Sequence, residues 1–191
     1  MQGLLIAGTS HCGKSTLAQR VGAALGWRVT STDKMGRHPG RPWPSIPAPV
    51  EEYYEALTDE TIYWFLRVHH TNMWPLLVRE IAAQVTAGGG FVFEGSALRP
   101  ESIATLNHKG VAAVCLYADQ AFLAERMRQE SGYASKDDRQ KLLIDKFIAR
   151  SLRDSTESVE AARAHGIPIV DVADAGALEE TAEQLVARAS G

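Results

Sequence analysis

The sequence predicts a single α/β domain built on a doubly wound, parallel, five-stranded sheet. Three observations support this fold class. Apolar runs of strand length alternate with stretches of helical periodicity, which is the pattern of a parallel sheet covered by helices. A glycine-rich turn joins the first apolar run to the first helix. The 191 residues, 45% of them hydrophobic, suffice for one well-packed core.

The elements follow one another in a regular order along the chain. We expect strands at about 2–7, 27–31, 91–93, 111–117 and 167–170. We expect helices at about 14–25, from near Val50, from Pro75 to about Ala87, from Pro100, after Asp119, over about 138–164 and near the C-terminus. Thr58 is a good N-terminal helix signal, and Pro75 suits the first turn of a separate helix. Ser135 with Asp138 resembles a capping box for the long helix.

The glycine-rich turn matches the pattern G-x-x-x-x-G-K-[ST] at every defined position. A strand, this loop and a helix form the context in which the pattern binds phosphate, through backbone N–H groups and the helix N-terminus. Lys14 can reach the β- and γ-phosphates of a nucleotide, and the Ser15 hydroxyl can ligate Mg²⁺. Cys12 is expected to contribute its backbone, and a thiol at a helix N-terminus favours a lowered pKa. The sequence therefore predicts a site for ATP, or GTP, with Mg²⁺, formed by Gly8, Thr9, Ser10, His11, Cys12, Gly13, Lys14, Ser15 and Thr16.

Composition excludes several other classes of function. The net charge of −3 gives no electrostatic footprint for nucleic acid. An apolar run near 18 residues is missing, so no membrane span is expected. The N-terminus lacks a basic segment, which argues against a signal peptide, and two cysteines suggest neither a disulfide framework nor a metal quartet. We expect a cytoplasmic protein, monomeric or homodimeric, whose partner is a small molecule.

Two acidic residues stand where predicted strands end. Ligands of doubly wound sheets bind beyond the carboxyl ends of the strands. Asp33 follows the second strand and Glu94 follows the third, so both are expected beside the phosphate loop. The alternatives are a turn residue for Asp33 and an ion pair at the strand end for Glu94.

This order of motifs resembles the nucleoside-monophosphate-kinase-like branch of P-loop proteins. The motifs are the phosphate loop, Ser31-Thr32-Asp33 after the second strand, and 91–95 with the sequence FVFEG. Within that branch the short chain is similar to shikimate kinase, gluconate kinase and chloramphenicol phosphotransferase. The resemblance implies that Asp33 meets the acceptor hydroxyl and acts in catalysis with Lys14, and that Glu94 acts on Mg²⁺ with Ser15. It also implies an acceptor-binding helical region at about 34–88 and a lid at about 128–140.

The residues expected to contact the acceptor or the transferred phosphate are basic and aromatic. A proline-stiffened loop directly after Asp33 offers hydrogen bonds, charge and a stacking plane, although a rigid surface connection is the alternative reading. The expected acceptor residues are Asp33, Arg37, His38, Arg41, Trp43, Glu94 and Arg99. Among arginines near the lid and on the long helix, Arg126 is favoured over Arg128, Arg150 and Arg153, because its apolar neighbours would turn it toward the sheet. His69 and His70 are interpreted as structural.

The leading hypothesis is an ATP- and Mg²⁺-dependent kinase for a hydroxyl of a small molecule, namely a metabolite, a nucleoside or an antibiotic. The first alternative is a nucleoside monophosphate kinase, in which Arg37, Arg41 and Arg99 grip an acceptor phosphate. The second is a nucleotide-binding regulator that transfers nothing.

Overall fold

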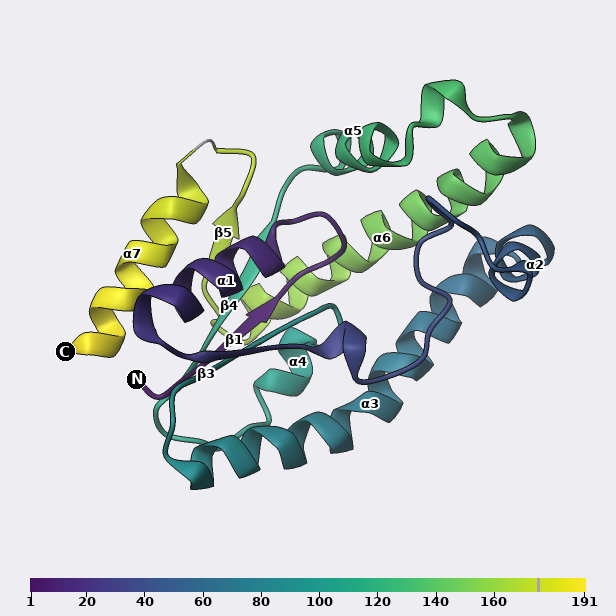
Figure 1. Ribbon diagram of the computed structural model, residues 1–191. Helices are drawn as coiled ribbons and strands as arrows, with labels where there is room; N and C mark the ends of the chain where they lie inside the picture. Colours follow the sequence, from purple (N-terminus) through teal and green to yellow (C-terminus); the bar gives the residue numbers. More distant parts are fainter. Residues whose placement is uncertain (175) are drawn as a thin grey trace.

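The computed structural model describes residues 1–174 and 176–191 and contains one five-stranded parallel sheet (Figure 1). Its strand order is β2-β3-β1-β4-β5, which confirms the predicted fold class. The strands are β1 (Gly3–Ala7), β2 (Arg28–Ser31), β3 (Phe91–Glu94), β4 (Val111–Tyr117) and β5 (Ile169–Asp171). Since β1 lies in the centre, between β3 and β4, the loop that follows it opens at the middle of the sheet edge.

Alternation along β1 explains why both faces of the sheet are covered. Leu4 and Ile6 belong to one buried cluster, and Leu5 and Ala7 belong to the other. All four side chains are essentially inaccessible to solvent. A strand buried on both faces has to be apolar throughout, which is why the sequence shows a continuous run there.

Helices form a layer on each side of the sheet (Figure 1). The helices are α1 (Lys14–Leu25), α2 (Ala48–Ala56), α3 (Asp59–Ala87), α4 (Pro100–Ile103), α5 (Gln120–Ser131), α6 (Asp138–Ala164) and α7 (Ala177–Ser190), with 3-10 turns η1 (Thr32–Lys34) and η2 (Tyr133–Ser135). Helices α1 and α7 pack together on one face, and α3, α4 and α6 cover the other. Helices α2 and α5 and the first turns of α6 extend beyond the carboxyl ends of the strands (Figure 1), and α5 supplies side chains that line the site there. In the described parts of the chain, no helix has both the length and the apolarity needed to cross a bilayer.

Most predicted boundaries are confirmed, including those of α1, β4 and α6, and the caps Thr58 and Asp119. Pro75 does not begin a helix, because α3 runs unbroken through it. The buried face of α3 continues across the proline, with Met73 before it and Leu77 after it, so packing outweighs the lost hydrogen bond. The predicted capping box is also wrong, since the Asp137 carboxylate accepts the Gln140 N–H at 2.7 Å.

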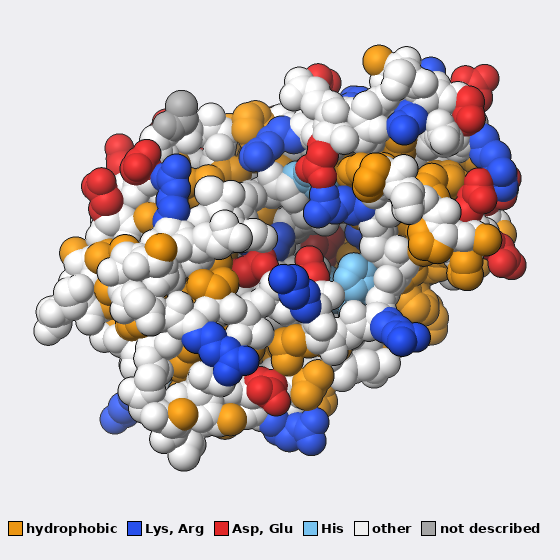
Figure 2. Space-filling model, in the orientation of Figure 1, with side chains coloured by type: hydrophobic (Ala, Val, Ile, Leu, Met, Phe, Trp, Pro, Cys, Tyr) orange, Lys and Arg blue, Asp and Glu red, His pale blue; other side chains and the backbone are white. Residues whose placement is uncertain are grey.

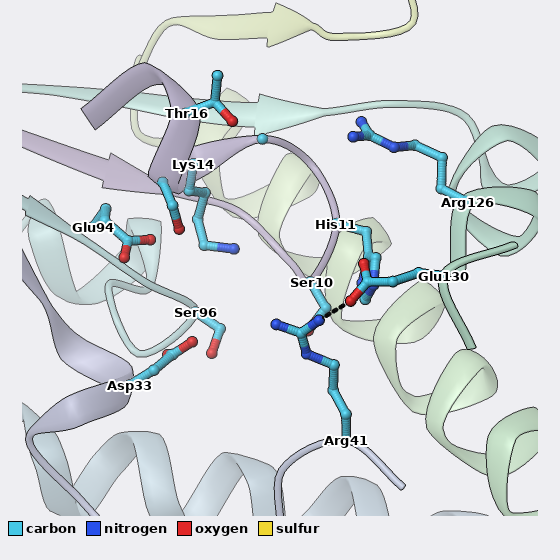
Figure 3. Close-up of a pocket in the computed structure, with 12 residues that line it drawn as sticks. Ser10, His11, Lys14, Thr16, Asp33, Arg41, Glu94, Ser96, Arg126 and Glu130 are labelled. Atoms are coloured by element: carbon cyan, nitrogen blue, oxygen red, sulfur yellow. Dashed lines mark hydrogen bonds and ion pairs between the residues drawn. The ribbon is translucent and has the colours of Figure 1, made fainter. Parts of the chain in front are cut away.

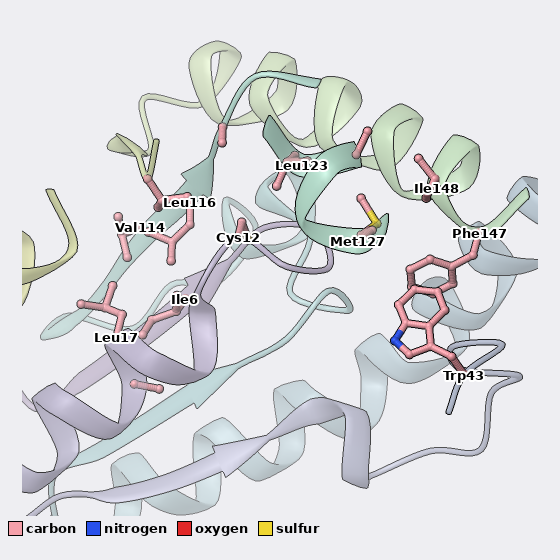
Figure 4. Packing of buried hydrophobic residues seen from close by; sticks show 14 of the residues in the cluster. Ile6, Cys12, Leu17, Trp43, Val114, Leu116, Leu123, Met127, Phe147 and Ile148 are labelled. Carbon is pink, nitrogen blue, oxygen red and sulfur yellow. The ribbon is translucent and has the colours of Figure 1, made fainter. Parts of the chain in front are cut away.

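The proline-rich loop between η1 and α2 is anchored by aromatic contacts. Trp43 is only 6% exposed and packs edge-to-face on Phe147 of α6, with ring centroids 4.8 Å apart (Figure 4). The Tyr54 hydroxyl of α2 donates a 2.7 Å hydrogen bond to the Gly40 carbonyl. These two anchors fix the loop on either side of Arg41.

Candidate active site

A hollow lined by charged side chains lies at the carboxyl edge of the sheet (Figure 2). A cavity of about 220 Å³ occupies it beside the phosphate loop, and Figure 3 shows its side chains. The lining residues are Ser10, His11, Gly13, Lys14, Ser15, Thr16, Asp33, Arg41, Glu94, Ser96, Arg126 and Glu130. They come from α1, η1, α5, the end of β3, the loops after β1 and β3, and the loop between η1 and α2, so the fold brings them together.

The phosphate loop requires glycine at its first position. Gly8 has φ +135°, and a Cβ there would stand 2.6 Å from the Leu116 carbonyl oxygen of the neighbouring strand. The loop is also tied to α6, because the Thr9 hydroxyl donates to the Ser151 carbonyl at 2.8 Å. The loop is therefore stabilised by the residues that pack against the protein interior, namely Gly8, Thr9 and Cys12. The other loop residues, Ser10, His11 and 13–16, line the cavity. Burial raises the pKa of the Cys12 thiol, so the lowered pKa expected from its helix position is wrong.

Lys14 is the central cation of this cavity. Its ammonium group donates to the Thr9 carbonyl at 2.5 Å, and only 8% of the residue is exposed. Burial lowers the pKa of Lys14, but the Cys12 thiol and the carboxylates of Asp33 and Glu94 raise it above its usual range. Lys14 is therefore a fixed positive charge that faces two acids across the cavity (Figure 3).

Gly95 allows the two acids to approach each other. It directly follows Glu94, has φ +149°, and a Cβ on it would stand 1.8 Å from Thr32 Oγ1 and 3.4 Å from Asp33 Oδ1. The end of β3 thus lies against η1, which carries Asp33. This close approach places the two predicted acids on one wall of the cavity.

The oxygen donors at this wall fit a magnesium ion. Ser15 and Glu94 line the cavity together with Asp33. Within the described residues, neither carboxylate is engaged in an ion pair. Hydroxyl and carboxylate oxygens, completed by phosphate and water, are the ligands that Mg²⁺ prefers.

A second cavity, of about 230 Å³, adjoins the first on the side of α3 and α6. Its lining residues are Ser10, Thr32, Asp33, His38, Gly40, Arg41, Leu66, His69, His70, Ser96, Ala97, Phe147 and Arg150. Four residues, Ser10, Asp33, Arg41 and Ser96, border both cavities. The two spaces therefore meet at Asp33, opposite the phosphate loop.

Arg150 is a buried cation in the second cavity. The residue is 9% exposed, its guanidinium lies 4.4 Å from the centre of the Phe147 ring, and Nη1 donates to the Tyr54 hydroxyl at 3.1 Å. Its Nε is buried without a hydrogen-bond partner, and no carboxylate of the described residues lies within ion-pair distance of it. A buried cation left in this state favours an anionic ligand.

Two of the histidines that line the same cavity, His69 and His70, have lowered pKa values. Burial lowers the pKa of His70 well below its usual range, and the charge of Arg99 lowers it further. Burial likewise lowers the pKa of His69, as does the neighbouring His38. Neutral imidazoles both donate and accept hydrogen bonds, which suits an acceptor that carries hydroxyl groups.

Comparison with known proteins shows the fold to which this site belongs. No protein-family model and no curated protein matches the chain. Among solved structures, a gluconokinase from Sinorhizobium meliloti 1021 matches 97% of this chain and 96% of its own at TM-score 0.54 and 22% identity. The chain has the P-loop kinase fold. A deoxyadenosine kinase from M. mycoides with bound dATP (12% identity, 99% of this chain and 100% of that chain, TM-score 0.54) agrees with this result. So does a shikimate kinase from Acinetobacter baumannii in complex with shikimate (13% identity, 97% and 91%, TM-score 0.50).

Five of the residues predicted to contact the acceptor, the metal or the transferred phosphate line one or both cavities. Asp33, Glu94 and Arg126 line the first cavity, His38 lines the second, and Arg41 borders both. The Arg126 side chain extends from α5 toward the loop in Figure 3.

Three predicted acceptor residues lie outside both cavities. Trp43 is buried against Phe147 and anchors its loop. Arg99 is buried and ion-paired with Asp154 and Glu101, so its charge is already balanced. Arg37 is exposed and lines neither space.

Sequence reasoning missed other residues that line the cavities. Glu130, Ser96 and the pair His69 and His70 had no motif, and the histidines were interpreted as structural. Arg150 was considered only as a lid arginine. Helical spacing gave one usable signal, since Phe147 and Arg150 are three apart on α6 and therefore share a face.

Proposed function

We propose that this chain transfers the γ-phosphate of ATP to a hydroxyl group of a small molecule. The observation that carries the proposal is the shared wall of the two cavities. Asp33 borders both the space beside the phosphate loop and the space beside Arg150. A nucleotide in the first and an acceptor in the second would meet there, which is the in-line arrangement that phosphoryl transfer needs.

The residues at this wall have complementary tasks. The loop N–H groups and Lys14 bind the phosphates, and Ser15 and Glu94 would hold Mg²⁺, which neutralises phosphate charge when bound. Asp33 orients the acceptor hydroxyl and accepts its proton as the new P–O bond forms. Lys14, facing Asp33, stabilises the negative charge that develops between them.

Arg150 supports an acceptor that carries a carboxylate. Its unpartnered Nε belongs to an edge of the guanidinium that binds carboxylates through two parallel hydrogen bonds. Arg41, which also lines this cavity, is paired with Glu130, so the charge of Arg150 is left to balance a monoanion. A phosphate dianion would face Asp33 in the same cavity with a surplus of negative charge.

The same count of charges argues against a nucleoside monophosphate acceptor. Of the three arginines that would grip its phosphate, Arg99 is engaged with Asp154 and Arg37 lies outside both cavities. Only Arg41 borders the acceptor space. The proposal is therefore a kinase for small hydroxy acids.

ADP release with matched acceptor pairs tests this function. The panel contains gluconate and sorbitol, glycerate and glycerol, and the common nucleoside monophosphates, each with Mg²⁺ and ATP. We expect turnover with a hydroxy acid, and a KM for it that rises about 10²-fold in Arg150→Gln, in line with loss of a charge-assisted bidentate contact.

Arg153→Gln is the matched control, because Arg153 is three residues along the same helix and pairs with Glu60 at the surface. Turnover of neutral polyols as fast as of acids would refute the acceptor class. Equal effects of the two arginine variants would do so as well. Absence of ADP release across the panel, with no heat of binding for Mg–ATP, would refute the kinase.

A further inference from the structure

Arg41 is the cationic side chain at the junction of the two cavities. Of the four residues that border both spaces, two are serines and one is an acid. Under the proposed function, on which this inference rests, the phosphoryl group crosses this junction. The charge at that point would therefore act on the group in transit.

Arg41 is bound by an acid from the other side of the site. Its Nη1 donates to Oε1 of Glu130, the dashed contact in Figure 3. The second oxygen of Glu130 lies 2.7 Å from Nε2 of His11, on the phosphate loop. Glu130, near the end of α5, thus connects the acceptor-side loop to the phosphate loop.

This ion pair is easily exchanged. The Arg41 and Glu130 side chains are 52% and 46% exposed, and exposed pairs of this kind shift an equilibrium by a factor of about five or less. A phosphate offers more charge and oxygens spaced to fit the planar guanidinium. The Glu130 side chain is 46% exposed, so water can solvate its carboxylate when Arg41 leaves.

The backbone of Arg41 is well placed for such an exchange. Tyr54 holds the neighbouring Gly40 by a 2.7 Å hydrogen bond, and Trp43 is buried two residues later. The side chain can therefore change partner while its Cα stays at the junction.

We propose that Arg41 binds the γ-phosphate during transfer and that Glu130 holds its guanidinium at the junction before the nucleotide binds. The arginine that neutralises the transferred group then comes from the loop before α2, in addition to Lys14 and Arg126. Glu130 acts through Arg41 and is a positioning residue.

Calorimetry with Mg²⁺ and two nucleotides, ADP and the non-hydrolysable analogue AMP-PNP, tests the assignment. We expect Arg41→Gln to weaken AMP-PNP binding about tenfold or more while the Kd for ADP stays within about twofold, because ADP lacks the γ-phosphate. Glu130→Gln should strengthen AMP-PNP binding relative to ADP by up to about fivefold. That gain should vanish in the double variant, because there is no Arg41 to release.

Two surface variants serve as controls. Arg139→Gln removes an arginine of similar exposure, 55%, that pairs with Glu51 and Glu55 outside both cavities. Glu125→Gln removes an acid from the same helix as Glu130. Neither should change the ratio of the two Kd values.

Three results would overturn the inference: equal losses for both nucleotides in Arg41→Gln, no loss in that variant, or a Glu130→Gln gain that persists without Arg41. If the unmodified protein bound neither nucleotide, the proposed function would fail first, and this inference would fall with it.

Discussion

Replacing Gly95 by alanine tests how the site is assembled. Gly95 sits between the two proposed acids of the active site and allows β3 to lie against η1. The added Cβ would stand 1.8 Å from Thr32 Oγ1 and 2.9 Å from Thr32 Cβ, where real Cβ atoms are not found. Thr32 is 2% exposed and cannot swing into solvent, so η1 itself has to move.

Two costs add in the Gly95→Ala variant. A φ of +149° is strained for any residue with a Cβ, at about 1–3 kcal/mol. Overpacking of a buried contact adds about 1–3 kcal/mol. The free energy of unfolding should therefore fall by about 2–6 kcal/mol, and Asp33, next to Thr32, should move away from Lys14.

Urea denaturation measures the loss of stability, and ADP release measures the displacement of Asp33. With a urea m-value of about 2 kcal/mol/M, the midpoint should drop by about 1–3 M, and turnover should fall with it. Adding Thr32→Ala removes the 1.8 Å contact and should recover part of the loss. Gly89→Ala is the control, because Gly89 has ordinary φ and no atom within 4 Å of the added Cβ.

The reasoning is refuted if Gly95→Ala unfolds at the same urea concentration as Gly89→Ala. It is also refuted if stability falls while turnover is untouched, because the displacement of η1 would then not reach Asp33.

The remaining predictions concern charge. Lys14→Ala should abolish transfer while the urea midpoint stays close to that of the unmodified protein; near-normal ADP release would remove the phosphate-loop mechanism. Asp33→Asn should keep AMP-PNP binding and lower turnover about 10²-fold or more, as loss of a general base does; if turnover barely changes, Asp33 is a turn residue. Burial lowers the pKa of His70, so the unfolded chain binds its proton at a higher pH than the folded one. Stability should therefore fall as pH drops below about 6.5 toward 5, and His70→Gln should make that slope shallower by up to about 1.4 kcal/mol per pH unit; parallel slopes in urea titrations would contradict this.

Sequence reasoning succeeded where the determinants are local. The phosphate loop directly joins a strand to a helix, so the sequence pattern and the structure that it requires lie within one short segment. Its defining residues are Gly8, Gly13, Lys14 and Ser15. The acids at the strand ends were also predictable, because parallel strands present their carboxyl ends at one edge.

It failed where a partner distant in sequence decides the outcome. The sequence predicted that Arg99 binds the acceptor, but its guanidinium pairs with Asp154 of α6, 55 residues away. The sequence predicted that a helix begins at Pro75, but the buried face of α3 continues through this position. Each outcome depends on packing that local propensity does not contain.

The chain alone determined the phosphate loop, the alternation of strands and helices, and the acids that flank the loop, because these depend on short-range backbone geometry and periodicity. Tertiary structure decided which cationic side chains can contact a ligand. Arg41 and Arg150 face the junction and the second cavity, whereas Arg99 is neutralised by a buried acid. The difference between these arginines is determined by burial and by charge balance between segments that are brought together only in the folded protein.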